Sequence, residues 1–137
     1  ECDGETFKAF TDAKEKCPHA KLDREKQKKL FDKFMDAEYK PGEAVLRFRA
    51  DIENKNPALR SFPLARINLN KHARVEDKYK IWPTMHMAVS VDDPLMKLTH
   101  VFRGKDHEVN MERQMMVHKV LGMKSPTYFH IGIDEVY

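Results

Sequence analysis

The segment of residues 98–131 constrains the fold more than any other part of this sequence. Residues 98–102, with Leu98, Val101 and Phe102, predict a short buried strand, and residues 127–131 predict a second strand. The run between them, residues 107–121, predicts a helix that ends at Gly122. A strand, a helix and a strand at this spacing form one βαβ unit, whose two strands are parallel. The sequence therefore predicts an α/β fold.

The helix of this unit carries two finer predictions. Asp106 stands directly before it and is a suitable N-cap residue. The side chains expected on its buried, apolar face are Val109, Met116, Val120 and Met123.

The first part of the chain predicts two helices followed by strands. The helices cover residues 6–16 and a segment from Asp23, as N-cap, to about residue 37. Strands are expected at residues 44–52, 64–69 and 78–82, and the apolar residues after Pro83 do not alternate cleanly. The first strand alternates and predicts one buried face (Leu46, Phe48, Ala50, Ile52) and one polar face (Val45, Arg47, Arg49, Asp51).

Composition sets broad limits on function. A chain of 137 residues forms one average domain or two small lobes. Its formal charge of +3 permits a nucleic-acid partner without demanding one. No apolar run approaches the ~20 residues that a membrane span needs, and no signal-peptide pattern opens the chain. We therefore expect no membrane partner and a cytoplasmic location.

The two cysteines raise the question of a metal site. Without a secretory signal, a disulfide framework is not expected. Cys2, Cys17 and His19 supply three soft ligands, whereas structural zinc takes four. A zinc site on these three residues is one interpretation, and two ordinary thiols with a surface histidine is the other.

Several short strings resemble one family in their order and spacing. They are Asn56-Pro57-Ala58-Leu59-Arg60, His72-Ala73-Arg74, Asp77-Lys78-Tyr79, Trp82-Pro83-Thr84, Val91-Asp92-Asp93 and Thr99-His100-Val101-Phe102-Arg103-Gly104. From about residue 40 to residue 126 the chain resembles the catalytic domain of class I glutamyl-tRNA synthetases of the archaeal and eukaryotic branch. The resemblance implies the second part of a Rossmann-like nucleotide-binding domain in residues 78–137. It also implies an inserted α+β lobe in residues 1–77 that binds the tRNA acceptor end. The resemblance further implies a helix after Pro83 that ends near Asp92 and Asp93.

The two ATP-handling signatures of that family do not occur in this sequence. The string His130-Ile131-Gly132-Ile133 resembles the first of them, but its fourth residue is isoleucine, and we interpret it as a strand ending at a glycine turn. We therefore expect a fragment that works with the rest of a parent synthetase and is inactive alone.

The resemblance assigns the amino-acid site to Arg103, Met85 and Val89. An arginine can hold the second carboxylate of glutamate through two parallel hydrogen bonds, whereas an amide offers one acceptor and unsuitable donors. Arg103 therefore favours glutamate over glutamine. Met85 and Val89 stand where bacterial relatives have polar residues, so ordinary core packing is the alternative for both.

The resemblance also implies ATP and tRNA contacts. Asp106 and His107 match positions that meet ATP or the amino acid, and Gly132 and Ile133 match positions beside adenine; Mg²⁺ is expected with the ATP. The residues that match an acceptor-stem surface are Arg47, Arg49, Arg60, Arg66, Lys71 and Arg74.

The favoured interpretation is a fragment of a glutamate–tRNA ligase that uses ATP, glutamate and tRNA. Three alternatives stay open: a glutaminyl-tRNA synthetase fragment, a noncatalytic RNA-binding module, and an α/β domain whose charges do nothing specific.

Overall fold

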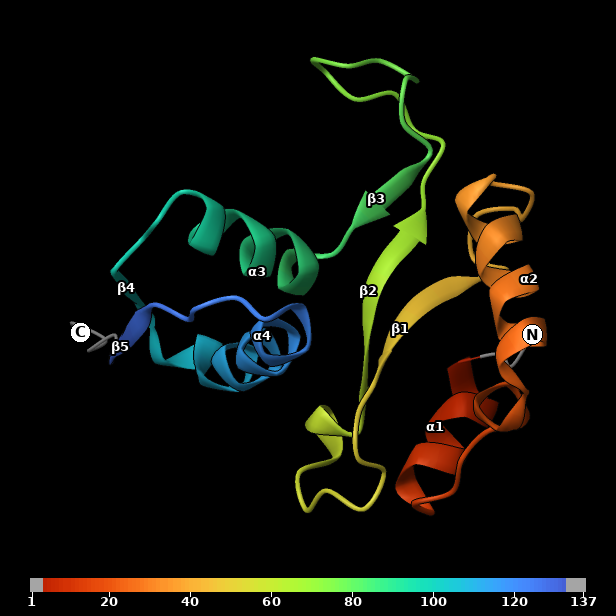
Figure 1. Ribbon diagram of the computed structural model, residues 1–137, viewed down its shortest axis with the longest axis horizontal. Helices are drawn as coiled ribbons and strands as arrows, with labels where there is room; N and C mark the ends of the chain where they lie inside the picture. Colours follow the sequence, from red (N-terminus) through yellow and green to blue (C-terminus); the bar gives the residue numbers. More distant parts are fainter. Residues whose placement is uncertain (1–3, 133–137) are drawn as a thin grey trace, which may run out of the picture. The chain divides into compact units, whose positions relative to one another are not determined.

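Two units, Glu1–Thr84 and Met85–Tyr137, make up the computed structural model, which describes residues 4–132 (Figure 1). The boundary lies seven residues beyond the one expected after Asp77. The reason is that β3 (Ile81–Pro83) pairs antiparallel with β2 (Ser61–Ile67) and so belongs to the first unit. Thr84 completes this attachment, because its amide and hydroxyl donate to the carbonyls of Leu64 and Pro63, each at 2.8 Å.

The first unit combines helices with a three-stranded antiparallel sheet. Its elements are α1 (Gly4–Asp12), η1 (Pro18–Lys21), α2 (Arg24–Met35), β1 (Val45–Arg49), η2 (Pro57–Leu59), β2 and β3, with sheet order β1-β2-β3. The predicted N-cap of α2 is confirmed, since the Asp23 carboxylate accepts a 2.8 Å hydrogen bond from the Lys26 amide.

The core of the first unit lies where α2 meets the sheet. Phe34 of α2 packs with Ala65 and Ile67 of β2, and four partly buried side chains surround them: Tyr39, Ala44, Leu46 and Ile81. Phe62 is 1% exposed and stacks on Phe48 with ring centroids 4.9 Å apart. The contacts of Phe34 hold α2 on the sheet, and the stacked rings of Phe48 and Phe62 hold β1 against β2.

The strict alternation expected along β1 is wrong at Arg47. Leu46, Arg47 and Phe48 are all half-buried, and the pairing register shifts between Leu46 and Arg47 because β2 carries one extra residue, Leu64, at this point. The Arg47 guanidinium lies 3.9 Å from the centre of the Phe7 ring and donates to the hydroxyl and carbonyl of Ser61. These contacts come from α1 and β2, so alternation along β1 alone could not reveal the partial burial of Arg47.

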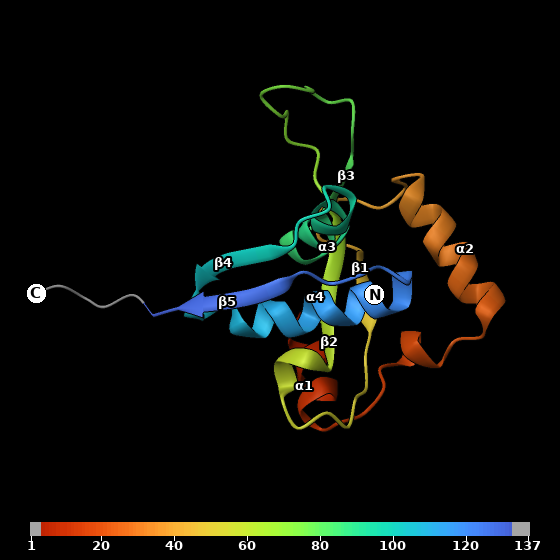
Figure 2. The same ribbon diagram turned by 60° about the vertical axis from the view of Figure 1, so that its left-hand side comes forward.

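A hairpin connection of residues 68–80 extends from the strands β2 and β3 (Figures 1 and 2). His72 and Glu76 close its tip through two backbone hydrogen bonds of 2.9 and 2.8 Å. The rings of His72 and Trp82 stack with centroids 5.0 Å apart, and Tyr79 meets Trp82 edge-on. Aromatic packing therefore orders a connection that is otherwise mostly exposed.

The second unit contains the βαβ arrangement that the sequence predicts, but the prediction that residues 98–102 form a buried strand is wrong, because Leu98 and Phe102 are 40% and 65% exposed. Its elements are α3 (Met85–Leu95), β4 (His100–Gly104), η3 (Lys105–His107), α4 (Glu108–Leu121) and β5 (Thr127–Ile131). β4 and β5 are parallel, with Arg103 opposite His130 and Gly104 opposite Ile131 (Figure 2). The predicted end of α4 is confirmed, because Gly122 has a φ of 66° in the left-handed region that glycine accepts readily.

Two predictions for α4 are wrong. Asp106 lies inside the 3₁₀ turn η3, and the N-cap position of α4 is taken by His107, whose side chain makes no cap bond. The buried face consists of Gln114, Val117 and His118, whereas Val120 is 72% exposed. Residues 114, 117 and 118 have the spacing of one helix face, but that face is mostly polar, so a search for apolar residues selects a neighbouring face.

The helices in residues 4–132 are short. The longest, α4, has 14 residues, whereas crossing a bilayer takes about 20 apolar residues. Within this part of the chain, no helix combines the length and the apolar character that a membrane crossing requires.

Candidate functional site

Arg103 lies near the carboxyl end of β4, in the parallel pair of the second unit. Open α/β sheets place ligand-binding groups at the carboxyl ends of their parallel strands. Within residues 4–132, the Nη2 atom of Arg103 is buried and has no hydrogen-bond partner. A buried guanidinium nitrogen with unused donors is suited to a bound carboxylate or phosphate.

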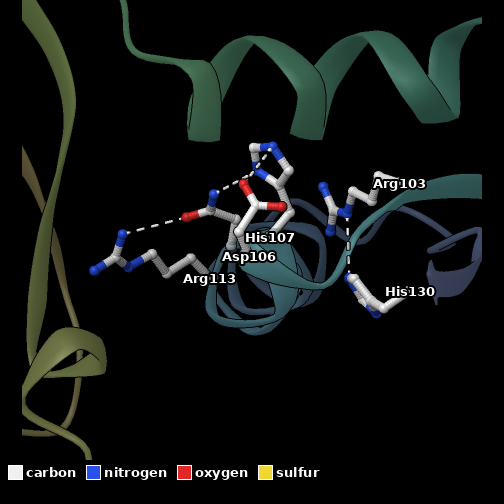
Figure 3. A network of polar contacts seen from close by, with 6 residues as sticks. Arg103, Asp106, His107, Arg113 and His130 are labelled. Carbon is white, nitrogen blue, oxygen red and sulfur yellow. Dashed lines mark hydrogen bonds and ion pairs between the residues drawn. The ribbon is translucent and has the colours of Figure 1, made fainter. Parts of the chain in front are cut away.

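Two residues of β5, His130 and Tyr128, contact the guanidinium of Arg103. Its Nε atom donates to Nε2 of His130 at 3.3 Å, as Figure 3 shows. Its guanidinium carbon lies 4.6 Å from the centre of the Tyr128 ring, within the range of a cation–π contact. The parallel pairing places both partners on the strand beside β4, so the backbone register sets the position of the guanidinium.

A polar network begins directly after β4, in the turn that carries Asp106 and His107 (Figure 3). Nε2 of His107 lies 3.3 Å from an Asp106 carboxylate oxygen, and Nδ1 of His107 lies 2.9 Å from the amide nitrogen of Asn110. Nη1 of Arg113 lies 3.5 Å from the Asn110 oxygen and 3.1 Å from Nε2 of His86. The network thus joins the turn to α4 and α3.

The network determines the tautomer of His107. Arginine can only donate, so the Asn110 oxygen faces Arg113 and the Asn110 amide group donates to Nδ1 of His107. The proton of a neutral His107 then lies on Nε2, from which it points toward Asp106. A histidine held in this way presents a defined donor beside a carboxylate.

His86 and Arg113 are affected by burial. Burial lowers the pKa of His86 below its usual value, and the positive charge of Arg113 lowers this pKa further. Burial also lowers the pKa of Arg113. The lowered pKa of His86 favours a neutral ring, which accepts a hydrogen bond from Arg113.

The other residues expected in the amino-acid and ATP sites also lie in the second unit. Met85 is the first residue of α3 and is 44% exposed, and Val89, half-buried, lies one turn later on the same helix. Asp106 is exposed and His107 is half-buried. Ile133 lies outside the described residues, and its role beside adenine stays a prediction.

Four further side chains of the second unit contain buried polar atoms, and none of them was expected from the sequence. They are Asp93 of α3, Gln114 and His118 of α4, and Tyr128 of β5. Each of these four side chains has at least one buried polar atom without a hydrogen-bond partner among the described residues. The available signal was the four-residue spacing of Gln114 and His118, which places two polar side chains on one face of α4.

The described residues do not support the zinc hypothesis. In residues 4–132, no three histidine, cysteine, aspartate or glutamate side chains come together in a way that would hold a metal ion. Cys17 is a half-buried free thiol two residues from His19, and Cys2 lies outside the described residues. Two neighbouring ligands fall short of the four that structural zinc takes.

Three of the six basic residues expected to contact tRNA make internal contacts. Arg60 is 6% exposed and donates to the carbonyls of Asn54 and Thr11 at 2.8 and 2.9 Å. Arg47 is bound to Ser61 and lies on Phe7, as described above, and Arg49 donates to the carbonyl of Ala20. These contacts give the three arginines a role in holding the first unit together.

The remaining three basic residues are exposed. Arg66 projects from β2, while Lys71 and Arg74 lie in the hairpin connection of residues 68–80. Lys71 has an exposed ion pair with Glu76 at 3.8 Å, which contributes little to stability. Their positions leave these charges open to solvent and to a polyanionic partner.

Comparison with known proteins places the chain in a family. Residues 1–134 match the family described as "tRNA synthetases class I (E and Q), catalytic domain". The chain belongs to this family, which confirms the resemblance seen in the short strings of its sequence.

Individual relatives share a large part of this sequence. It is 40% identical over 135 residues to a protein named glutamate–tRNA ligase from Methanopyrus kandleri, a match that covers 98% of the chain and 24% of that protein. A glutamate–tRNA ligase from Methanosphaera stadtmanae is 43% identical over 138 residues, with 98% and 24% covered. The chain thus spans about a quarter of the length of these curated relatives.

Among solved structures, a glutamate tRNA ligase from Elizabethkingia meningosepticum in complex with its amino acid is similar to the chain. The match covers 96% of this chain and 24% of the other, at 22% identity and a TM-score of 0.44.

Proposed function

We propose that this chain is part of a glutamate–tRNA ligase and that Arg103 binds the side-chain carboxylate of glutamate. The observation that carries this proposal is the unused, buried Nη2 group of Arg103 near the carboxyl end of a parallel strand. Relatives of about 40% identity that are named glutamate–tRNA ligases support it.

The chemistry of Arg103 favours glutamate over glutamine. A carboxylate accepts two hydrogen bonds from a guanidinium and neutralises its charge, whereas an amide brings an NH₂ group that faces the cation unfavourably. Met85 and Val89 line the site with apolar atoms in this proposal, so that recognition of the side chain rests on Arg103. A glutaminyl-tRNA synthetase is the rival that this arginine disfavours.

The proposed reaction needs no nucleophile from the protein. An oxygen of the glutamate α-carboxylate bonds to the α-phosphorus of ATP while the bond to the bridging oxygen of pyrophosphate breaks, and pyrophosphate leaves. A terminal ribose hydroxyl of tRNA then attacks the carbonyl carbon of glutamyl-adenylate, loses its proton, and AMP leaves. Positioning and charge stabilisation supply the catalysis in such reactions.

ATP would lie beside the turn that follows β4, where His107 presents a fixed donor and Asp106 a carboxylate. In this proposal the second unit is the later part of a Rossmann-like domain, with the parallel pair β4 and β5 as two of its strands. Mg²⁺ would accompany the ATP phosphates, and the residues described in this chain offer no dedicated cage for it. The rest of the nucleotide site would come from other parts of the parent protein.

The first unit would serve as the inserted lobe that contacts the acceptor end of tRNA. Support comes from the exposed charges of Arg66, Lys71 and Arg74, two of them on a projecting connection that also carries exposed rings. Binding of this kind rests mainly on phosphate charge and RNA shape. Arg60, being buried, would act on RNA only through the fold of the lobe.

The test is the amino-acid dependence of ATP–pyrophosphate exchange by the full-length protein that contains this chain, with tRNA present. The proposal predicts exchange with glutamate and at least about a hundredfold lower kcat/KM with glutamine, as expected for a site built around a charged partner. Equal use of the two amino acids, or exchange with neither, would refute it.

A further inference from the structure

The register of β4 and β5 places two side chains of β5 on the same face of the strand pair as Arg103. Arg103 lies opposite His130 in this parallel pairing, so their side chains are neighbours on one face. Tyr128 is two residues before His130 and shares that face, because successive strand residues point to opposite sides. The adjacent residues Phe102 and Phe129 point to the other face, where their rings stack with centroids 4.9 Å apart.

Both neighbours contact the guanidinium of Arg103. Its Nε–H group donates to Nε2 of His130 at 3.3 Å (Figure 3), and its carbon atom lies 4.6 Å from the centre of the Tyr128 ring. A ring nitrogen accepts a hydrogen bond only when it carries no proton, so the proton of a neutral His130 lies on Nδ1. Among residues 4–132, Nε is the only Arg103 nitrogen that has a hydrogen-bond partner.

A guanidinium can receive a carboxylate in two ways. Side-on binding uses Nε–H and one terminal nitrogen, whereas end-on binding uses both terminal nitrogens, Nη1 and Nη2. The bond to His130 occupies the only hydrogen of Nε, which closes the side-on arrangement of Arg103. The end-on pair of donors stays available for a ligand.

We infer that His130 and Tyr128 are positioning residues for Arg103, which hold its guanidinium so that Nη1 and Nη2 receive the side-chain carboxylate of glutamate end-on. This inference rests on the proposed function of Arg103. The hydrogen bond from Nε to His130 fixes the rotation of the guanidinium, and the Tyr128 ring supports it through a cation–π contact.

The physical advantage is preorganisation. An arginine side chain has many rotamers, and a ligand that must order it loses binding free energy in doing so. A guanidinium that two side chains already hold avoids this loss. A histidine suits this task because the ring that accepts the bond is neutral. A carboxylate in its place would pair with the arginine charge and compete with the substrate for it.

The first test uses two substitutions of His130 in the full-length ligase. His130→Phe keeps a ring and removes the acceptor, whereas the amide oxygen of His130→Gln can accept in place of Nε2. Thr127→Val is the matched control, because Thr127 is exposed on the same strand. The KM values for glutamate and for ATP are measured by pyrophosphate exchange with tRNA present.

We expect His130→Phe to raise the glutamate KM by about 10- to 100-fold, the range that one hydrogen bond from a charged donor represents. His130→Gln should bring the glutamate KM back to within about fivefold of the wild type, and the ATP KM should stay within about twofold in both variants. Tyr128→Leu, which removes the ring under the guanidinium, should raise the glutamate KM more than Tyr128→Phe, which keeps it.

A second readout locates the proton of His130 directly. NMR of the full-length protein with isotope-labelled histidine distinguishes protonated from unprotonated ring nitrogens, and the signals of His130 are assigned by their loss in His130→Gln. The inference predicts a protonated Nδ1 and an unprotonated Nε2 in the wild type. This measurement requires neither activity nor the folding of His130→Phe.

The outcomes separate this inference from the proposed function. A wild-type enzyme without glutamate-dependent exchange would refute the proposed function, and the histidine signals would still decide whether His130 holds Arg103. A protonated Nε2 would overturn the inference, because that atom could not accept the bond. An equal rise of both KM values, or an effect no larger than that of Thr127→Val, would overturn it as well. So would a His130→Gln enzyme as impaired as His130→Phe, because the ring would then act by packing alone.

Discussion

A substitution of Arg60 tests whether this basic residue of the first unit stabilises the fold or contacts RNA. The resemblance to tRNA synthetases marks Arg60 as an RNA contact, whereas the structure places its guanidinium inside the unit, bound to two backbone carbonyls. We predict that Arg60→Met destabilises the chain without removing an RNA contact. Methionine replaces the apolar stem of arginine but none of its donors.

The magnitude follows from the two hydrogen bonds. Each bond from a charged donor contributes about 1.5–3 kcal/mol. The Thr11 carbonyl keeps a second bond, from the Lys14 amide at 3.2 Å, so the loss there is partly compensated. The apolar methionine side chain is buried more favourably than arginine, which offsets another part of the lost hydrogen-bond energy. The remaining destabilisation is about 2–4 kcal/mol.

Urea unfolding of the 137-residue chain measures this change, with Arg66→Met as the control. Arg66 is exposed on β2, so its substitution should change the free energy of unfolding by less than about 0.5 kcal/mol. Below the unfolding transition, Arg60→Met should bind an acceptor-stem RNA hairpin as the wild type does. Unchanged stability together with weakened RNA binding would refute the structural role of Arg60.

Three further predictions concern the core, the histidines and the hairpin connection. Phe62→Ala should lower the free energy of unfolding by about 3–5 kcal/mol, because Phe62 is 1% exposed and stacked on Phe48; a loss below 1 kcal/mol in urea titration would contradict this packing. Burial lowers the pKa values of His86 and His118 below 6.5, so as pH falls through 6.5 the unfolded chain gains protons that the folded chain does not take up. Stability should therefore fall between pH 7.5 and 5.5, and His118→Asn should reduce this fall; an equal slope in both proteins would argue against the burial of His118. Arg74→Met should weaken binding of the acceptor-stem hairpin and reduce the slope of log affinity against log salt by about 1, whereas an unchanged slope would place Arg74 away from the phosphates.

Local signals allowed much of the fold to be predicted. The βαβ unit follows from the spacing of two apolar runs and from Gly122, and the start of α2 follows from Asp23, because capping and turn chemistry act within a few residues. The family of the chain, and with it the candidate role of Arg103, follows from short strings in a fixed order.

The predictions that failed depend on contacts between distant residues. Asp106 has the chemistry of an N-cap, but a 3₁₀ turn after β4 moves the start of α4 beyond it. Val120 is apolar and exposed, while Gln114 and His118 are polar and buried, so the buried face of α4 does not follow the apolar residues of its sequence. The burial of Arg60 depends on carbonyls 6 and 49 residues away, which no local pattern reveals.

The most direct test of the central claim is the steady-state kinetics of Arg103→Ala in the full-length ligase, assayed by tRNA-dependent ATP–pyrophosphate exchange. Lys119→Met, which removes an exposed cation from α4, is the control. Loss of one partner of a buried charge pair costs about 2–5 kcal/mol, so kcat/KM for glutamate should fall roughly 30- to 5,000-fold with the KM for ATP nearly unchanged. Equal losses for glutamate and ATP, or a fall no greater than that of Lys119→Met, would contradict glutamate recognition by Arg103.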